Sequence, residues 1–297
     1  MNKLCVALLL TLSAPLAIAE GSLTSAWLAE GATNRVYLLG SVHLLRESDY
    51  PLPAVVDDAY ADAETLVMEI DMDDLDPVAT QSLVNELGML PDGESLADLM
   101  GSDMYARAEE AAAAIDIPID MLEQSEPWLA AMTVEQMLLF RMGFNPMLGV
   151  EMRLTDRARS DGKPIEGFET AEEQLLFLDG LSLEAQREML LQTLIDSAEL
   201  QEIMDDTIEA WRKGDTAFIE ETMLADMQQY EELNKVIVVD RNHRWTDAIE
   251  EMLDDEDDYL VIVGTLHLVG DDGVPRLLEK RGIRIRQLAA SGLEEDQ

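Results

Sequence analysis

Two of the three histidines in this chain follow a glycine at the same spacing. One Gly-x-x-His pattern spans Gly40–His43 and the other spans Gly264–His267, and an apolar run precedes each glycine. An imidazole is a common metal ligand and a common general acid or base. A single Gly-x-x-His is weak evidence, because a histidine near a strand end is more often fixed by structural hydrogen bonds. Its recurrence near both ends of the chain predicts one shared functional site.

Two carboxylates accompany these histidines at predicted strand ends. Glu69 ends one short β-prone segment and Glu169 ends another, just before a predicted helix. In a parallel sheet, ligands bind beyond the carboxyl ends of the strands. We therefore expect both carboxylates to lie at the same sheet edge as His43 and His267, although each could be an ordinary solvated carboxylate. A glycine before each histidine lets the backbone turn sharply there.

Two imidazoles with one or two carboxylates match the ligand set of a catalytic metal ion. We expect His43, His267 and Glu69 to hold a divalent ion, Mn, Co or Zn, with water in the open position. The ion would lower the pKa of that water and polarise the carbonyl under attack. A free carboxylate could then act as general base.

Arg241 and Asn242 stand at the start of a predicted helix. Asn242 could be a helix cap, and Arg241 could hold a substrate oxyanion or a carboxylate of the site. His243, the third histidine, is expected to be exposed on that helix.

The elements that must position these residues come from both ends of the chain. Residues 26–29 and 35–39 flank a polar turn and predict a β-hairpin. A helix from Pro53 to Ala63 and a strand from Thr65 to Ile70 follow, which makes a βαβ unit and implies a parallel sheet. The further strands are predicted at residues 163–169, 259–263 and 282–286, and helices at 171–178, 182–233 with a break near Gly214, from 240, and 273–281.

The fold class predicted is α/β, with a mainly parallel central sheet assembled from N- and C-terminal segments and a large helical middle region. We expect a single domain over residues 20–290 with a helical insertion at about 77–160 and a disordered tail at 291–297. No Pro-, Gly- or Ser-rich linker divides the chain.

The net charge of −42 restricts the partners. It arises from 62 acidic against 20 basic residues. Phosphate backbones would be repelled, so nucleic acid is excluded as a partner, and a peptide or small-molecule substrate is expected. Most individual carboxylates are expected to be solvated surface without a role in chemistry.

The first residues are typical of a secretory signal peptide. Lys3 precedes an apolar run from Leu4 to Leu12, and small residues end the segment at Ala19. We predict export to the periplasm or beyond, with cleavage after Ala19, and the alternative is an uncleaved anchor. The only cysteine, Cys5, would leave with this segment, so the mature protein would have no disulfide. No other stretch approaches the ~18 continuous apolar residues of a membrane helix, so no stable membrane insertion is expected after cleavage.

Taken together, these motifs resemble those of the TraB/GumN (PrgY) family, which is related to the Tiki proteases that act on Wnt. The resemblance rests on Trp27, Tyr37–His43, Met68-Glu69, Gly167–Thr170 with Gln174, Arg241-Asn242 and Val263–Gly270. It implies a fold like that of the erythromycin esterase and ChaN superfamily. It also implies a divalent-metal-dependent hydrolase or protease built on His43, His267 and Glu69, with Glu169, Arg241 and Asn242 in support.

Two hypotheses from different classes follow. The first is an exported, peptidase-like hydrolase in which a metal activates water. The second is a non-catalytic periplasmic protein that binds haem or a peptide through the same histidines, since the superfamily also includes a haem-binding protein. If His43 and His267 were more than about 10 Å apart, they could not share an ion, because ligand atoms lie ~2 Å from their metal. Purely structural histidines would then be favoured.

Overall fold

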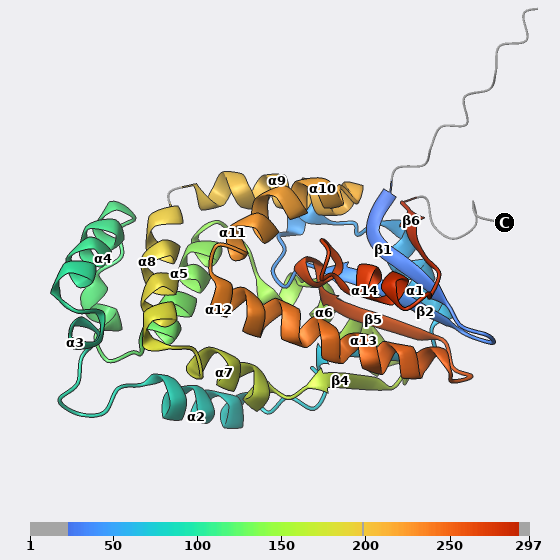
Figure 1. The fold of residues 1–297 in the computed structure, drawn as a ribbon, viewed down its shortest axis with the longest axis horizontal. Coiled ribbons are helices and arrows are strands. Elements are labelled where there is room, and N and C mark those ends of the chain that lie inside the picture. The colour runs from blue at the N-terminus through green and yellow to red at the C-terminus, as the bar shows by residue number, and fades with distance from the viewer. Residues whose placement is uncertain (1–22, 198, 291–297) are drawn as a thin grey trace, which may run out of the picture.

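A six-stranded sheet forms the centre of the protein, which a computed structural model describes for residues 23–197 and 199–290 (Figure 1). The strands are β1 (Leu23–Glu30), β2 (Arg35–Ser41), β3 (Thr65–Ile70), β4 (Ile165–Glu169), β5 (Tyr259–Gly264) and β6 (Ile285–Ala289). They lie in the order β4-β3-β5-β2-β1-β6. The predicted signal peptide of residues 1–19 and the predicted tail of residues 291–297 lie outside the described residues.

Four neighbouring strands, β4, β3, β5 and β2, run parallel. The predicted hairpin is the antiparallel pair β1–β2, and β6 extends it on the other side of β1. Strand β5 inserts between β2 and β3, so segments from opposite ends of the chain meet at the middle of the sheet. The predicted α/β class, with a mainly parallel sheet built from both ends of the chain, is confirmed.

The last strand begins three residues later than predicted. Residues 281–283 instead close the preceding helix, because the amides of Gly282 and Ile283 donate to Glu279 and Leu278. Gly282 has a φ of 87°, a left-handed conformation that glycine adopts at helix ends without steric cost. The prediction placed this turn inside the strand.

Helices surround the sheet and fill the middle of the chain. The α-helices are α1 (Ala54–Asp62), α2 (Pro77–Gly88), α3 (Leu96–Met100), α4 (Ser102–Ala114), α5 (Pro127–Arg141), α6 (Val150–Asp161), α7 (Ala171–Asp179), α8 (Leu183–Asp196), α9 (Leu200–Lys213), α10 (Thr216–Ile219), α11 (Ala225–Met227), α12 (Glu231–Asn234), α13 (Asp240–Leu253) and α14 (Val274–Lys280). Short 3-10 turns are η1 (Glu47–Asp49), η2 (Ile119–Leu122), η3 (Pro146–Leu148) and η6 (Thr265–Leu268), and two π-helical turns are η4 (Glu220–Leu224) and η5 (Lys235–Val239). Within the described residues, no helix has both the length and the apolar character that crossing a bilayer requires.

Apolar side chains bury both faces of the sheet, and this packing holds the strands whose carboxyl ends carry the site residues. Leu39 and Ile262 pack on one face with residues of α1, α6 and α9, whereas Leu38 and Val261 pack on the other with α13 and α14. This alternation follows from the two-residue period of a strand. A third apolar cluster joins α3, α4, α5 and α8, the helical part at the opposite end of the molecule from β1 and β6 (Figure 1).

Candidate functional site

The two Gly-x-x-His segments follow adjacent parallel strands and lie side by side. Strand β2 pairs with β5 in a register that places Ser41 opposite Gly264. The hydroxyl of Thr265 donates to the carbonyl of Ser41 at 2.9 Å, which ties the two loops together. Because β3 and β4 continue the parallel sheet, Glu69 and Glu169 emerge at the same edge.

Gly264 leaves open the point at which the site residues meet. A Cβ at this position would lie 3.3 Å from Glu69 Oε1, 3.4 Å from His43 Nε2 and 3.6 Å from His267 Cδ2. Both imidazoles therefore approach one point above the sheet edge, well inside the separation of about 10 Å beyond which they could not share an ion. The glycine provides room for a cradle that a side chain would fill.

His267 is buried and neutral. Its Nδ1 lies 2.6 Å from Asn242 Oδ1, an atom that only accepts, so Nδ1 carries the proton and Nε2 keeps its lone pair. The amide of Asn242 is oriented in turn by donation to the Asp272 carbonyl at 2.8 Å. The imidazole packs against Trp245, with ring centres 4.5 Å apart. Burial lowers the pKa of His267 to about 3.

His43 has the opposite environment. Its Nδ1 lies 2.7 Å from Glu151 Oε1, and the same carboxylate accepts a hydrogen bond from Ser41 Oγ. The charge of Glu151 raises the pKa of His43 to about 10, so the imidazole is protonated at neutral pH. The side chain is 58% exposed and faces the open pocket.

Glu69 connects the second histidine loop to α13. Its Oε1 accepts the Gly264 amide at 2.7 Å and lies 4.0 Å from His267 Nε2. Its Oε2 accepts from Arg241 Nη2 at 2.6 Å and from Gln174 Nε2 at 3.2 Å. Burial by itself would raise the pKa of this carboxyl, but the positive charges of His43 and Arg241 and the hydrogen bond from the Gly264 amide hold it below its ordinary value. Glu69 is therefore ionised.

Arg241 holds two carboxylates of the site, which is one of the two roles predicted for it. Besides Glu69, its Nε donates to both oxygens of Glu169, at 3.0 and 3.1 Å. Arg244 and Gln174 also donate to Glu169, at 2.8 and 3.3 Å. Glu169 is buried and does not line the pocket, so it acts on the site through Arg241.

Asn242 does not cap a helix, and that predicted alternative is wrong. The π-helical turn η5 runs directly into α13, and Val239, the residue before α13, has helical φ and ψ angles of −66° and −52°. An N-cap residue needs non-helical angles. Asn242 instead lies inside the helix, fully buried, and serves His267. His243, beside it, is exposed as predicted.

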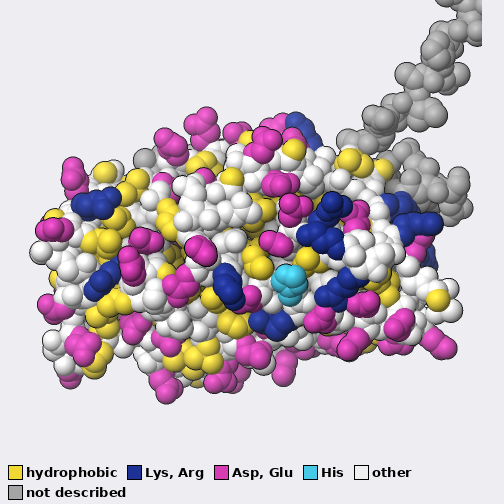
Figure 2. All heavy atoms as spheres, viewed as in Figure 1, with side chains coloured by type: hydrophobic (Ala, Val, Ile, Leu, Met, Phe, Trp, Pro, Cys, Tyr) yellow, Lys and Arg dark blue, Asp and Glu magenta, His cyan; other side chains and the backbone are white. Residues whose placement is uncertain are grey.

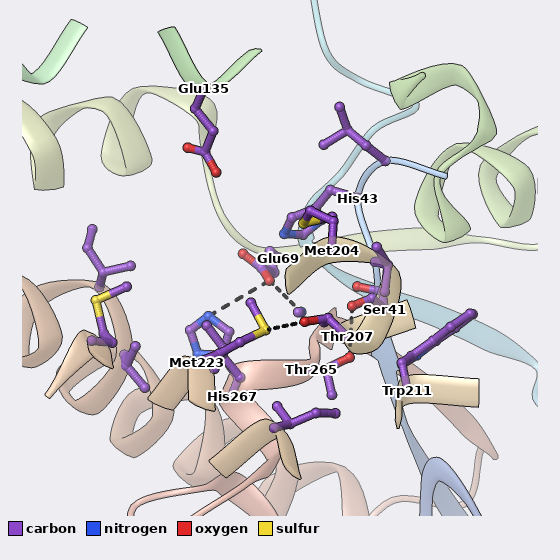
Figure 3. A pocket seen from close by; sticks show the side chains of 18 of the residues that line it. Ser41, His43, Glu69, Glu135, Met204, Thr207, Trp211, Met223, Thr265 and His267 are labelled. Atoms are coloured by element: carbon purple, nitrogen blue, oxygen red, sulfur yellow. Dashed lines mark hydrogen bonds and ion pairs between the residues drawn. The ribbon is translucent and has the colours of Figure 1, made fainter. Parts of the chain in front are cut away.

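A pocket of about 300 Å³ opens above this edge of the sheet. Figure 3 shows His43, Glu69 and His267 around its centre, with Glu135 pointing toward them from α5. Apolar side chains form most of the remaining wall: Val42, Leu44, Leu139, Met204, Trp211, Ile219, Met223, Met227, Ile237, Val238 and Leu266. An apolar concavity with a few convergent polar groups is the usual form of a small-ligand site.

The model of the TraB/PrgY/gumN family matches residues 25–287 of this chain. The chain belongs to this family. Its similarity to "Uncharacterized protein YbaP" of Escherichia coli (strain K12) is 24% identity over 246 residues, covering 82% of this chain and 87% of the relative. The protein of the same description from Shigella flexneri aligns with the same figures. No solved structure matches the chain significantly.

Two residues of this TraB/PrgY/gumN protein's pocket region were not predicted from the sequence, Glu151 and Glu135. Glu151 lies in the first turn of α6, and the preceding Gly149 packs so closely on the carbonyl of His43 that a Cβ there would clash. The sequence signal for Glu151 was a glycine followed by an acidic first turn, which is common at helix starts. Glu135 lies among apolar residues of α5, and no local pattern distinguishes it from a surface carboxylate.

The donor atoms of this TraB/PrgY/gumN site include one pair close to the spacing of two metal ligands. Among the described residues, no three side chains of His, Cys, Asp or Glu form a group arranged to hold an ion. His267 Nε2 and Glu69 Oε1 lie 4.0 Å apart, wider than the ~3.3 Å between two tetrahedral ligands that each lie ~2 Å from one ion, so a small movement of one side chain would bring both onto an ion. His43 Nε2 points to the same cradle above Gly264. Arg241 Nη1 lies 3.3 Å from His267 Nε2 and shares this space.

Proposed function

We propose that the protein is an exported, divalent-metal-dependent hydrolase with a peptide or small-molecule substrate, most simply a peptidase. The observation that carries the proposal is the convergence of His43, Glu69 and His267 on the cradle above Gly264. Export rests on the signal-like residues 1–19 of the sequence.

The residues at this edge have the chemistry of a metal site. His43, Glu69 and His267 would hold the ion, Mn, Co or Zn, because imidazole and carboxylate are ligands of all three. Each histidine gives its Nδ1–H to a side-chain oxygen, Glu151 for His43 and Asn242 for His267. Such partners fix the orientation of metal-binding imidazoles and direct Nε2 to the site.

The chemistry supplied by a bound divalent ion is Lewis-acid activation of water and of the bond to be cleaved. The protein's own residues orient the site. Arg241 balances the charges of Glu69 and Glu169, and the ionised Glu69 can accept a proton when it is not a ligand. The apolar wall holds the uncharged part of a substrate against the sheet edge.

Metal content tests the proposal. Wild type, His43→Ala, His267→Ala and His243→Ala are stripped with EDTA, incubated with Mn²⁺, Co²⁺ or Zn²⁺, desalted and measured by elemental analysis. We expect about one ion per chain in wild type and in His243→Ala, the matched control because His243 is exposed and outside the site, and loss of the ion in the other two. A wild-type protein that takes up none of these ions would contradict the proposal. Release of new termini from casein, blocked by EDTA, would then test the peptidase activity.

A second candidate function is a non-catalytic binding protein for haem or a peptide. The observation that favours it is the position of Arg241. Its guanidinium donates a hydrogen bond to Glu69 and lies next to His267 Nε2, so a positive charge is already present where a metal ion would bind. Haem titration followed by absorbance tests the haem version: we expect a spectral shift in wild type that is absent in His43→Ala. No shift in wild type would remove that version.

A further inference from the structure

Among the described residues that line the pocket, Glu135 is the charged group that the proposed chemistry does not use. It lies on α5, within the helical middle region, and its side chain lines the same pocket as Leu139 one turn later. The other titratable residues that line the pocket all lie on the sheet-edge side: His43, Glu69, Arg241 and His267. Figure 3 shows the carboxylate of Glu135 on the opposite wall, directed toward them.

Glu135 makes no hydrogen bond and no ion pair with another side chain among residues 23–197 and 199–290. Glu69, the other carboxylate of the pocket, is by contrast bonded to Arg241 and Gly264. The surrounding protein raises the pKa of Glu135, although the charge of His43 opposes this shift. Glu135 is an exposed residue whose side chain lines the pocket, so a cation brought by a ligand could pair with its carboxylate through a charge-assisted hydrogen bond.

The wall of the pocket that holds Glu135 is rich in methionine. Met204 of α9, Met223 of η4 and Met227 of α11 line the pocket from three separate elements. Methionine side chains are flexible and polarisable, so they adapt to apolar groups of different shapes. The pocket therefore has an adaptable apolar wall, an unpaired negative group at one side and the candidate reaction centre at the other.

We propose that Glu135 is a specificity-determining residue that binds a positively charged group of the substrate, while an apolar side chain of the substrate packs against Met204, Met223 and Met227. The substrate class is a peptide with a cationic group near the bond that reaches the sheet edge. This inference rests on the proposed hydrolase function for the placement of that bond. Both the amino terminus of a peptide and a lysine or arginine side chain supply the required cation.

Three tripeptide amides of equal length distinguish these sources: Leu-Leu-Leu-amide, its N-acetylated form, and N-acetyl-Lys-Leu-Leu-amide. Each is titrated calorimetrically into purified wild type, Glu135→Gln and Glu202→Gln, and mass spectrometry checks that the peptide is intact. Where a peptide is cleaved, kcat/KM gives the same comparison. Glu202, on the outside of α9 and away from the pocket, controls for the loss of one negative charge.

In wild type, we expect at least one cationic peptide to bind about tenfold or more tightly than the neutral one, the size of effect that a charge-assisted hydrogen bond provides. This preference should fall to about one in Glu135→Gln and persist in Glu202→Gln. The cationic peptide that is preferred identifies the amino terminus or the basic side chain as the group bound. A wild type with no preference, no binding of any peptide, or a preference that Glu135→Gln retains would overturn the inference.

Metal content separates this inference from the proposed function. Glu135→Gln should take up the same metal as wild type, because Glu135 is not among the proposed ligands. A charge preference that depends on Glu135 in a protein that takes up no metal would support the recognition role and contradict the hydrolase. Metal uptake without a charge preference would support the hydrolase proposal and contradict the recognition role of Glu135.

Discussion

The two Gly-x-x-His loops have the same local sequence pattern and equivalent places on adjacent strands, yet their histidines have opposite properties. His43 is 58% exposed, is paired with a carboxylate and has a pKa of about 10. His267 is 7% exposed, is paired with a neutral amide and has a pKa of about 3. At neutral pH one imidazole is a cation and the other is neutral.

The difference shows that the motif fixes where the histidine lies, while the helix that packs on it sets its charge. Helix α6 places Glu151 against His43, and α13 places Asn242 against His267. A carboxylate partner stabilises the protonated imidazole, whereas burial beside an amide favours the neutral form. Without a metal ion, the two loops thus present one protonated and one neutral imidazole to the same pocket. His43 would have to release its Nε2 proton to bind an ion, because only the neutral imidazole is a ligand.

The largest loss of stability should come from removing the buried charge of Arg241, next to the loop that carries His267. Arg241 is 6% exposed and joins Glu69 and Glu169, so Arg241→Met leaves two carboxylates near His267 without their main partner. We expect a loss of about 3–5 kcal/mol in the free energy of unfolding, measured by denaturant titration. Arg244→Met removes the same charge from a side chain that is 51% exposed, and should cost under about 1 kcal/mol. Equal losses in the two variants would mean that burial does not distinguish them.

Alanine substitutions of the two motif glycines, Gly40 and Gly264, should have different effects, one on stability and the other on metal uptake. A Cβ on Gly40 would lie 2.9 Å from Thr265 Oγ1 and 3.1 Å from the Ser25 carbonyl, so Gly40→Ala should lower the free energy of unfolding by about 1–3 kcal/mol. A Cβ on Gly264 meets only the polar groups of the cradle, at 3.3 to 3.6 Å. Gly264→Ala should therefore unfold much like wild type but lose metal uptake. Thermal unfolding and elemental analysis measure both, and a Gly264→Ala variant with full metal uptake would contradict this role.

The pKa values of the two histidines should differ most clearly, although the variant used to test them is expected to change stability least. NMR of ¹⁵N-histidine-labelled metal-free protein should show His43 protonated and His267 neutral between pH 5 and 8. In Glu151→Gln the pKa of His43 should fall from about 10 toward the ordinary value of about 6.5, because the Glu151 charge is the main cause of its shift. His267 should not respond. A wild-type His43 that titrates near pH 6.5 would show that Glu151 does not control it.

The same shifts predict opposite pH dependences of stability. The pKa of His43 is raised on folding, so its contribution is complete below about pH 6.5 and is lost as the pH rises through about 10. The pKa of His267 is lowered on folding, so its contribution is complete above about pH 6.5 and is lost as the pH falls toward about 3. Comparing denaturation midpoints of His43→Ala and His267→Ala with wild type across this range measures each contribution separately.

Local patterns predicted the elements that hold the site but not its partners. The hairpin, the βαβ unit and the ends of β3 and β4 followed from apolar runs bounded by glycine and acidic residues. Asn242 was also considered a helix cap, because nothing local shows that η5 continues into α13. Glu151 was missed because its contact with His43 spans 108 positions of the sequence.

The sequence by itself determined that four polar side chains lie at or just beyond the carboxyl ends of four strands, since strand period and glycine placement are local properties that short-range sterics enforce. The sequence also determined family membership, because the family model matches residues 25–287 from the sequence alone. Only the tertiary structure decided that β5 lies between β2 and β3, and which helix meets each histidine. Those contacts depend on non-local packing, and the charge of each imidazole depends on them in turn.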